Sequence, residues 1–181
     1  MIKKTLILLT VLIAMPVFAE NFTLESPEIA STGFTAEQEF SGFGCSGKNV
    51  SPKIEWKNPP ANTKSFGLTM YDPDAPTGSG WWHWVVVNIP QTASALNKGS
   101  GDVSAKKAPV GVLQTRTDFG AYGYGGPCPP EGSPAHRYKF KLFALNVEKL
   151  PVEKDSSAAL VGYMLNTHSI ASTEFTVNYQ R

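Results

Sequence analysis

The sequence has only two cysteines, almost no net charge and a single long apolar run, and each scarcity excludes a class of protein. Sixteen Lys and Arg residues nearly balance 15 Asp and Glu residues, which gives a formal net charge of +1. A chain this close to neutral has no basic field to attract nucleic acid. Beyond the N-terminal segment, no stretch is long and apolar enough to cross a bilayer. We therefore expect no nucleic-acid partner and no stable membrane insertion.

The N-terminal segment, residues 1–19, is typical of a signal peptide. Lysines precede an apolar run from Leu6 to Ala14, and the small residues Val17 and Ala19 form an A-x-A-like cleavage site. Removing 19 of the 181 residues leaves 162, the size of one ordinary domain. No internal repeat or linker divides them, so we expect a single domain over residues 20–181. The mature protein should be periplasmic or secreted; the alternative is an uncleaved, tethered form.

The two cysteines, Cys45 and Cys128, lie far apart in the sequence. Export to an oxidising compartment favours a disulfide bond between them. The alternative is that each is a separate, small, buried apolar side chain. A zinc site has no supporting ligand spacing, and no other cofactor is indicated.

Alternating apolar and polar residues predict half-buried strands over Phe66–Tyr71 and Arg137–Leu142. The nearly continuous apolar run Trp84–Ile89 is typical of a central strand that is covered on both faces. The segments "KIEW" and "EFTVNY" add two more strands, and turn-forming segments such as "NPPANT" separate them. This pattern predicts a mainly β fold, a two-sheet antiparallel sandwich with few short helices.

One longer helix is predicted near the C-terminus, within residues 157–171. Asp155 or Ser156 can cap it, and its apolar residues fall on one face. A short terminal strand should follow this helix.

Polar residues end the apolar faces of three predicted strands. Side chains two apart on a strand share a face, so His83 should lie on the side of Val85 and Val87. If the three strands enter one core, their polar ends converge in a small pocket over an apolar floor. The predicted members of this pocket are Asp72, His83, His136 and Tyr138.

The segment from Asp118 to Ala135 is long and irregular, with five glycines and four prolines. Loops of this length inside compact domains are usually functional or disordered, and the prolines favour a fixed shape. Its glycines allow backbone N–H groups to approach a ligand closely, so the loop could wall the pocket and bind an anion. Asp74, before "Ala-Pro", is equally well explained as a turn-fixing residue.

Two other functions of this pocket are weaker alternatives. Two histidines and a carboxylate could bind a transition metal, but no short-spaced ligand pair fixes the geometry. Ser79 and Ser133 lie near the pocket, yet neither is in a nucleophile-elbow motif, and spacing places no general base. We therefore expect a protein that is not an enzyme and holds no metal, with a weak hydrolase or a metal-binding protein as the alternative.

The motifs "YDPDAP", the histidine of "WWHWVVVN", and "PPEGSPAHRYKF" resemble the signature motifs of the phosphatidylethanolamine-binding protein family, also called Raf kinase inhibitor-like proteins. The stretches "GFGCSGKNVSP", "GSGWWHWVVVNIP", "RTDFG" and "YGGPCPP" are similar to its bacterial branch. The resemblance spans about Phe40 to Tyr179, with the motifs in the same order.

The resemblance implies a two-sheet antiparallel sandwich whose small pocket accepts phosphate-like or phospholipid head groups. The residues that match the family's pocket are Asp72, His83, Pro129, Pro130, His136 and Tyr138. Where animal members have glycine before the Pro-Pro pair, this chain has Cys128, and a bridged cysteine there would stiffen the rim, so the resemblance does not imply the head-group specificity of animal members. The C-terminal helix also differs from the animal pattern, so the resemblance does not assign Tyr163 or Met164 to a pocket wall.

The expected ligand is therefore a small anionic or phosphorylated molecule. Histidines donate hydrogen bonds to phosphate oxygens, and a neighbouring carboxylate favours the charged imidazolium. Tyr138 adds a hydroxyl donor or an aromatic face for an ammonium group. The family name further implies a protein target such as a kinase or protease, and the family is compatible with a homodimer.

Overall fold

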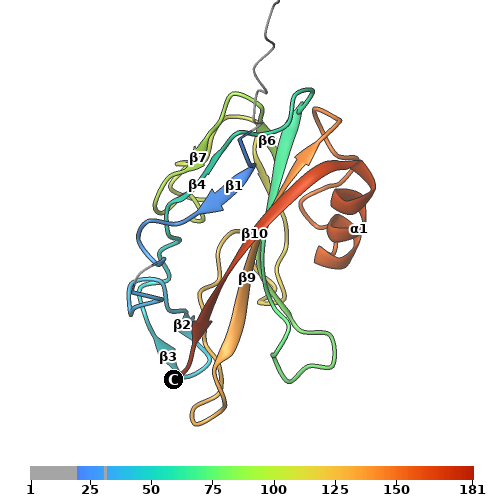
Figure 1. Cartoon of the computed structure of the whole chain (residues 1–181). Helices are drawn as coiled ribbons and strands as arrows, with labels where there is room; N and C mark the ends of the chain where they lie inside the picture. The colour runs from blue at the N-terminus through green and yellow to red at the C-terminus, as the bar shows by residue number, and fades with distance from the viewer. Residues whose placement is uncertain (1–19, 31) are drawn as a thin grey trace, which may run out of the picture.

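The computed structural model describes residues 20–30 and 32–181, so the predicted signal peptide lies outside the described residues. Its main element is a five-stranded antiparallel sheet in the order β10-β9-β5-β6-β8 (Figure 1). The strands are β5 (Ser65–Asp72), β6 (Trp81–Pro90), β8 (Leu113–Gln114), β9 (His136–Leu145) and β10 (Ser169–Tyr179). The three long central strands were all predicted from apolar patterning.

A smaller antiparallel sheet covers one face of this sheet. It has the order β1-β4-β7, with β1 (Thr23–Glu25), β4 (Ile54–Lys57) and β7 (Ala95–Leu96). The main core lies between the sheets, where the Trp56 ring of β4 packs 5.2 Å from the Phe66 ring of β5. A separate two-stranded hairpin, β2 (Ser41–Gly42) and β3 (Cys45–Ser46), lies beside the C-terminus. These layers confirm the predicted antiparallel β-sandwich.

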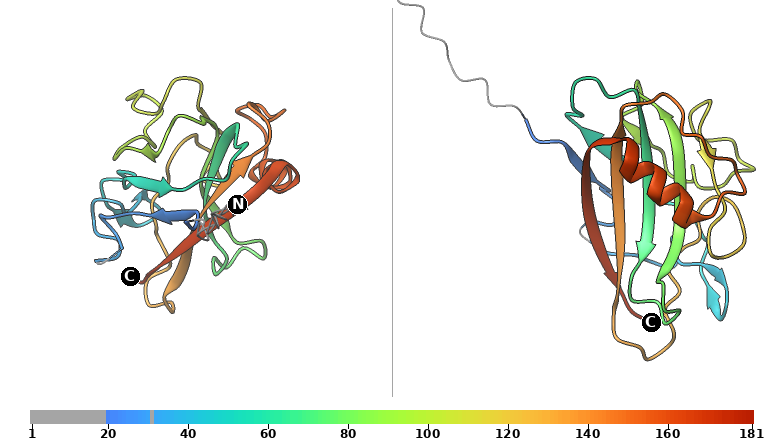
Figure 2. Two further views of the ribbon diagram at one scale, coloured as in Figure 1. Left: turned by 45° about the horizontal axis from the view of Figure 1, so that its top comes forward. Right: turned by 90° about the vertical axis from the view of Figure 1, so that its right-hand side faces the viewer.

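The helix α1 (Ala158–His168) covers the other face of the large sheet (Figure 2). Val161 and Leu165 of α1 are fully buried in a second apolar cluster with Val85 and Val87 of β6. Because the helix covers this face, β5 is buried on both sides and not half-buried as its alternating pattern predicted. Gly67, the small residue of that pattern, faces Leu165 directly.

The ends of α1 differ from the prediction. Its N-cap is Ser157, whose hydroxyl accepts a hydrogen bond from the Leu160 amide, and neither Asp155 nor Ser156 has this position. The helix ends at His168, and β10 begins at once and runs for 11 residues, so the terminal strand is not short. β10 continues through Ile170 because it pairs with β9 along almost its whole length.

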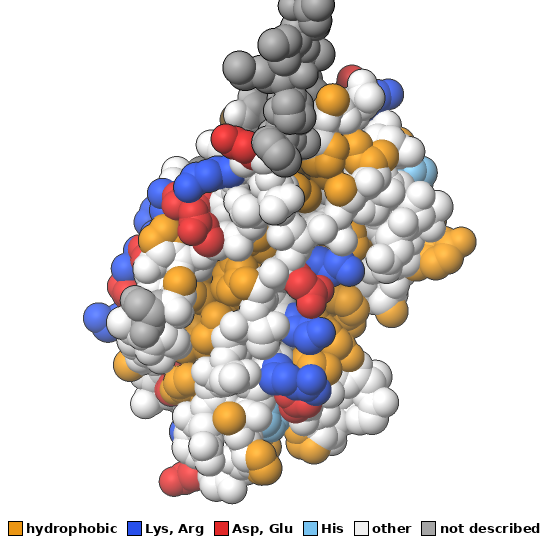
Figure 3. All heavy atoms as spheres, in the orientation of Figure 1, with side chains coloured by type: hydrophobic (Ala, Val, Ile, Leu, Met, Phe, Trp, Pro, Cys, Tyr) orange, Lys and Arg blue, Asp and Glu red, His pale blue; other side chains and the backbone are white. Residues whose placement is uncertain are grey.

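The surface carries charges of both signs. Lys139 Nζ lies 3.7 Å from Glu174 Oε1 across β9 and β10. Figure 3 shows Lys and Arg side chains interspersed with Asp and Glu side chains on this face, which therefore has no large patch of one sign. Within the described residues, no helix has the length and apolar character needed to span a membrane.

Candidate functional site

The candidate site lies where three neighbouring strands begin or end at the same edge of the large sheet. β5 ends at Asp72, β9 begins at His136, and β6 begins at Trp81. These strands run antiparallel, with Tyr71 opposite both Lys139 and Trp82, so their polar ends meet. The structure thus brings Asp72 and His136 together as the strand pattern predicted.

His83 reaches the same place, but by a different route from the one predicted. The pairing of β5 with β6 shifts between Met70 and Tyr71, which leaves one extra residue in β6 beside Trp84. Such a bulge puts two successive side chains on one side of the sheet. His83 therefore lies on the side of Trp84, opposite to Val85 and Val87. Its ring meets the Tyr138 ring edge-on, with 5.1 Å between centroids.

A buried carboxylate orients His136. Asp72 Oδ2 lies 2.7 Å from His136 Nδ1, and both side chains are almost completely buried. The other oxygen, Asp72 Oδ1, accepts a hydrogen bond from the Asp74 amide at 2.8 Å, which also fixes the turn after β5. Because the carboxylate can only accept from the Nδ1–H, it leaves Nε2 of His136 as the nitrogen available to a ligand.

His83 is held neutral by its surroundings. Its Nδ1 lies 2.8 Å from the Gly125 carbonyl and 3.1 Å from the Gly126 carbonyl, so Nδ1 carries the proton and donates it. Burial lowers the pKa of His83 to about 4, and these carbonyls and the charge of Asp72 oppose that shift only in part. The expected imidazolium is therefore wrong for His83. At neutral pH its Nε2 carries a lone pair and accepts hydrogen bonds.

Tyr138 supplies a hydroxyl at the floor of the site. The residue is fully buried, and its hydroxyl has no hydrogen-bond partner of ordinary geometry among the described residues. Burial, together with the negative charge of Asp72, raises the pKa of Tyr138 beyond its usual range, and the Cys128 amide opposes this only in part. Tyr138 therefore stays protonated and can donate a hydrogen bond.

These side chains line a cavity of about 190 Å³. Besides the predicted residues, its walls contain Phe43, Ala75, Pro76, Thr77, Trp81, Phe119 and Cys128. Strand periodicity could not predict the members that come from loops. The available signals were that Phe119 lies in the glycine-rich loop predicted to line the pocket and that Phe43 lies two residues before Cys45. Tyr163 and Met164 take no part, because α1 lies on the opposite face of the sheet.

The loop 118–135 forms the wall of the cavity, as predicted. Gly126 lies close to other backbone, since an added Cβ would lie 1.9 Å from the Gln38 carbonyl oxygen. Its amide donates to Asn49 Oδ1 at 2.7 Å. Gly123, Gly125 and Gly126 of this loop therefore serve close packing, and the carbonyls of Gly125 and Gly126 accept from His83.

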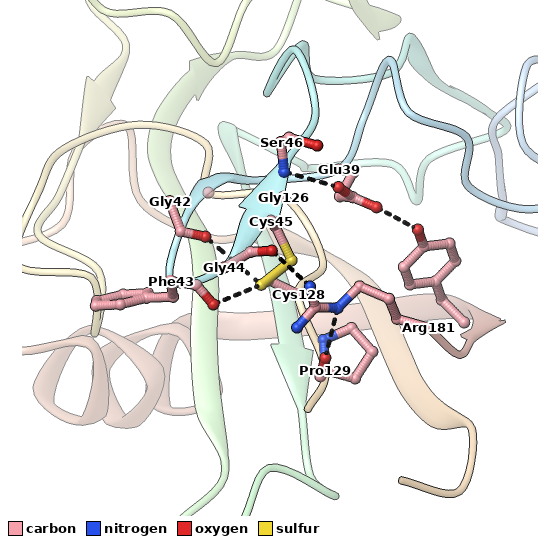
Figure 4. The surroundings of a disulfide bond; sticks show 12 residues. Glu39, Gly42, Phe43, Gly44, Cys45, Ser46, Gly126, Cys128, Pro129 and Arg181 are labelled. Carbon is pink, nitrogen blue, oxygen red and sulfur yellow. Dashed lines mark hydrogen bonds between the residues drawn. A yellow bond between two sulfur atoms is a disulfide. The ribbon is translucent and has the colours of Figure 1, made fainter. Parts of the chain in front are cut away.

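A disulfide bond between Cys45 and Cys128 fastens this wall to the β2–β3 hairpin, which confirms the predicted pairing (Figure 4). The Arg181 side chain makes a second link. Its guanidinium donates to the Gly44 carbonyl at 2.6 Å and to the Pro129 carbonyl at 3.2 Å. The C-terminus thus holds the hairpin and the proline wall together.

Asp74 holds the turn after β5 against the start of β9. Its carboxylate accepts two side-chain hydrogen bonds from Arg137, at 2.9 and 2.7 Å, and one from the Arg137 amide. The hydrogen bond from the Arg137 side chain lowers the pKa of Asp74 to about 2. Asp74 does not line the cavity, which agrees with a turn-fixing role.

Two further side-chain arrangements bear on the alternative functions. Ser133 Oγ lies 3.5 Å from Nε2 of His136, so Asp72, His136 and Ser133 form a chain. Among the residues that the structure describes, no group of three His, Cys, Asp or Glu side chains is placed to hold a metal ion.

Comparisons with known proteins agree on one family. A family model described as phosphatidylethanolamine-binding protein matches residues 30–180. The chain is 52% identical over 181 residues to UPF0098 protein YbcL of Escherichia coli (strain K12), covering 98% of each. It is 51% identical over 140 residues to UPF0098 protein YbhB of the same strain, covering 77% of this chain and 87% of YbhB.

Solved structures show the same relationship. The crystal structure of E. coli YbcL, described as a new member of the mammalian PEBP family, superposes with a TM-score of 0.85 at 52% identity, covering 88% of this chain and 98% of YbcL. A putative PEBP homolog, CT736 from Chlamydia trachomatis, superposes with a TM-score of 0.72 at 27% identity, covering 88% of this chain and 97% of that one.

Proposed function

This chain belongs to the phosphatidylethanolamine-binding protein family, and from that premise we propose that it is an exported, non-catalytic binding protein whose pocket takes a small phosphate-like group. One observation carries the proposal. His83, His136 and Tyr138 line one small cavity, where Nε2 of His83 and the Tyr138 hydroxyl have no hydrogen-bond partner among the described residues and Nε2 of His136 faces only the Ser133 hydroxyl, at 3.5 Å. Such a cavity suits a compact head group with several oxygens.

The free polar atoms match a protonated phosphate. Tyr138 O–H donates to a phosphate oxygen, and His136 Nε2 donates when its ring is charged. Neutral His83 can only accept at Nε2, which suits the P–OH of a phosphate monoanion. Phosphate esters lose this last proton with a pKa of about 6. We therefore expect binding to be strongest below that pH and to weaken above it.

Isothermal titration calorimetry tests this proposal. The mature, oxidised protein should bind inorganic phosphate and phosphoethanolamine at about pH 5.5 and at least tenfold more weakly at about pH 8. His83→Ala and His136→Ala should each abolish binding. His168→Ala, which changes the third histidine at the end of α1, is the matched control and should bind like the wild type. Unchanged binding by both pocket variants would rule out the pocket.

Export is a separate part of the proposal. It is supported by the signal-peptide pattern and by the disulfide, which suits an oxidising compartment. Fractionation of cells that express the full chain should recover the protein outside the cytoplasm, with the mass of a chain that begins at Glu20. A full-length protein confined to the cytoplasm would contradict export.

We also propose that the protein binds and modulates another protein, such as a kinase or protease. The name of the family supports this idea. An exported member meets targets in the envelope or, after secretion, in a host. A pull-down from envelope and host extracts, repeated with saturating phosphoethanolamine, should recover a partner whose binding depends on the ligand. Recovery of no partner from either extract argues against this role.

Hydrolysis is the second candidate function, and the Asp72, His136 and Ser133 chain favours it. A hydroxyl, a histidine and a carboxylate in this order can act as nucleophile, base and orienting group. p-Nitrophenyl acetate provides the test. Turnover that Ser133→Ala abolishes and Ser79→Ala retains would establish the hydrolase. Turnover no faster than in buffer would leave the binding function alone.

A further inference from the structure

Phe43 is an exposed aromatic residue in a backbone conformation that disfavours it. Its side chain is 72% exposed, and its φ is 51°. It forms the two-residue loop of the β2–β3 hairpin with Gly44, whose φ is 84°. Positive φ at both loop positions is typical of a type I′ turn, in which Asn or Gly is strongly preferred at the first position. The turn conformation therefore does not favour a phenylalanine here.

The Phe43 ring belongs to a stack of three nearly parallel rings, the aromatic platform of Phe40, Phe43 and Phe119. Phe43 lies 5.8 Å from Phe40 and 5.9 Å from Phe119, with interplanar angles of 26° and 21°. Phe40 and Phe119 are 4.1 Å apart at 25°. Stacked rings in this geometry can add another flat ring in an offset arrangement.

The aromatic platform adjoins the polar floor of the cavity. Phe43 and Phe119 both line it, and the Phe119 ring meets the His83 ring edge-on, with 5.3 Å between centroids. One small ligand can therefore reach the polar atoms and the aromatic platform together.

The hairpin that carries Phe43 is fixed in place. The Cys45–Cys128 disulfide and the hydrogen bond from Arg181 to the Gly44 carbonyl hold it at the two residues that follow Phe43 (Figure 4). A fixed hairpin presents the ring without a further ordering cost on binding. Two independent links thus hold the loop that carries Phe43 beside the cavity.

We propose that the aromatic platform is a subsite for the ring of an aryl phosphate whose phosphate group occupies the polar floor. This inference rests on the proposed function. The size of the cavity limits the ligand, because about 190 Å³ is below the range of about 300 to 1,000 Å³ of pockets that enclose drug-sized ligands. A phosphate with one ring is small enough for this space, and a long acyl chain is not.

The test compares three ligands by calorimetry at about pH 5.5: inorganic phosphate, phenyl phosphate and hexyl phosphate. The wild type should bind phenyl phosphate about tenfold more tightly than inorganic phosphate. Phe43→Asn should remove this gain and leave the affinity for inorganic phosphate within about twofold. Since asparagine suits the turn, this variant should melt no lower than the wild type. Tyr163→Ala, which changes an exposed aromatic residue on α1, is the control and should keep the gain.

Each outcome separates the subsite from the pocket. A wild type that binds none of the three ligands overturns the proposed function as well as the subsite. Binding of inorganic phosphate with no gain from the phenyl group overturns the subsite alone. An equal gain from hexyl phosphate overturns the selectivity for a ring. A full gain retained by Phe43→Asn also overturns the assignment to Phe43.

Discussion

At the scale of single residues, His83 makes the stability of the folded protein depend on pH. Its pKa is about 4 in the folded protein and about 6.5 when the chain is unfolded, so the unfolded chain binds more protons between these values. The contribution of neutral His83 to the free energy of unfolding should therefore be fully present above about pH 6.5. It should fall by about 3 kcal/mol as the pH drops to about 4. His83→Gln, which cannot be protonated, should remove this part of the slope.

Urea unfolding of both proteins across this pH range measures the effect. The difference in free energy of unfolding between the wild type and His83→Gln should change steadily between about pH 6.5 and 4. His168→Gln should follow the wild type, because His168 is only half-buried at the end of α1. A constant difference between the wild type and His83→Gln would mean that His83 is not held neutral.

Asp74 is a carboxylate paired with the cation Arg137, and its effect on stability falls at lower pH than that of His83. Its pKa falls from 3.8 to about 2 because Arg137 donates to the carboxylate, so the stabilisation is complete above about pH 4 and is lost as the pH falls toward 2. Arg137 is more than half exposed, which limits the effect to about 1 kcal/mol. Asp74→Asn should lower the free energy of unfolding by this amount at pH 7 and by nothing near pH 2. Equal losses at both pH values would exclude the ion pair as the cause.

The sequence predicted those site residues that lie on regular strands. Asp72, His136 and Tyr138 follow the two-residue alternation of β5 and β9 into the site. His83 was predicted as a pocket member but on the wrong side of its strand, because nothing in "WWHWVVV" marks the extra residue of a bulge. Phe43 was missed because a hairpin loop has no periodicity from which to assign a direction.

At the scale of elements, the loop 118–135 depends on glycine for close packing. Gly126→Ala would bring a methyl group against the backbone of Gln38 and Phe40, which cannot move aside as a side chain can. We expect a loss of about 2 to 3 kcal/mol in free energy of unfolding, and weaker phosphate binding as the wall shifts. Urea unfolding and calorimetry measure both. Gly120→Ala is the control for a glycine with no neighbour near its Cβ position, although its positive φ of 76° adds backbone strain.

A loss in Gly126→Ala no larger than in Gly120→Ala would show that positive φ, and not close packing, explains the glycines of this loop. The two variants differ in this respect because Gly126 has no positive φ.

A strand or helix could be predicted where its own apolar pattern reflects how it is buried. The central strand β6 shows its burial on both faces as a continuous apolar run. β5 looks half-buried because Gly67 and Thr69 are not apolar, yet α1 packs against that face, and Gly67 is small to admit Leu165. The C-terminal end of α1 and the length of β10 depend on pairing with β9, a contact that local patterning does not contain.

At the scale of the whole molecule, the disulfide is the covalent link between the first and last parts of the site. It joins residues 83 positions apart, so it restricts the unfolded chain strongly. The double variant Cys45→Ser and Cys128→Ser should lose about 4 kcal/mol in free energy of unfolding. Reduced wild type should unfold at the same urea concentration as the double variant, because both lack the same constraint.

The same double variant separates stability from the form of the pocket. Arg181 still links Gly44 to Pro129 when the disulfide is absent, so the proline wall should remain near the polar floor. Inorganic phosphate, held by His83, His136 and Tyr138, should then bind within about threefold of the oxidised wild type. Phenyl phosphate should lose more, because its ring depends on a hairpin that is then held by the Arg181 link alone and is less rigid. Equal losses for both ligands would mean that the disulfide shapes the polar floor itself and not only the platform beside it.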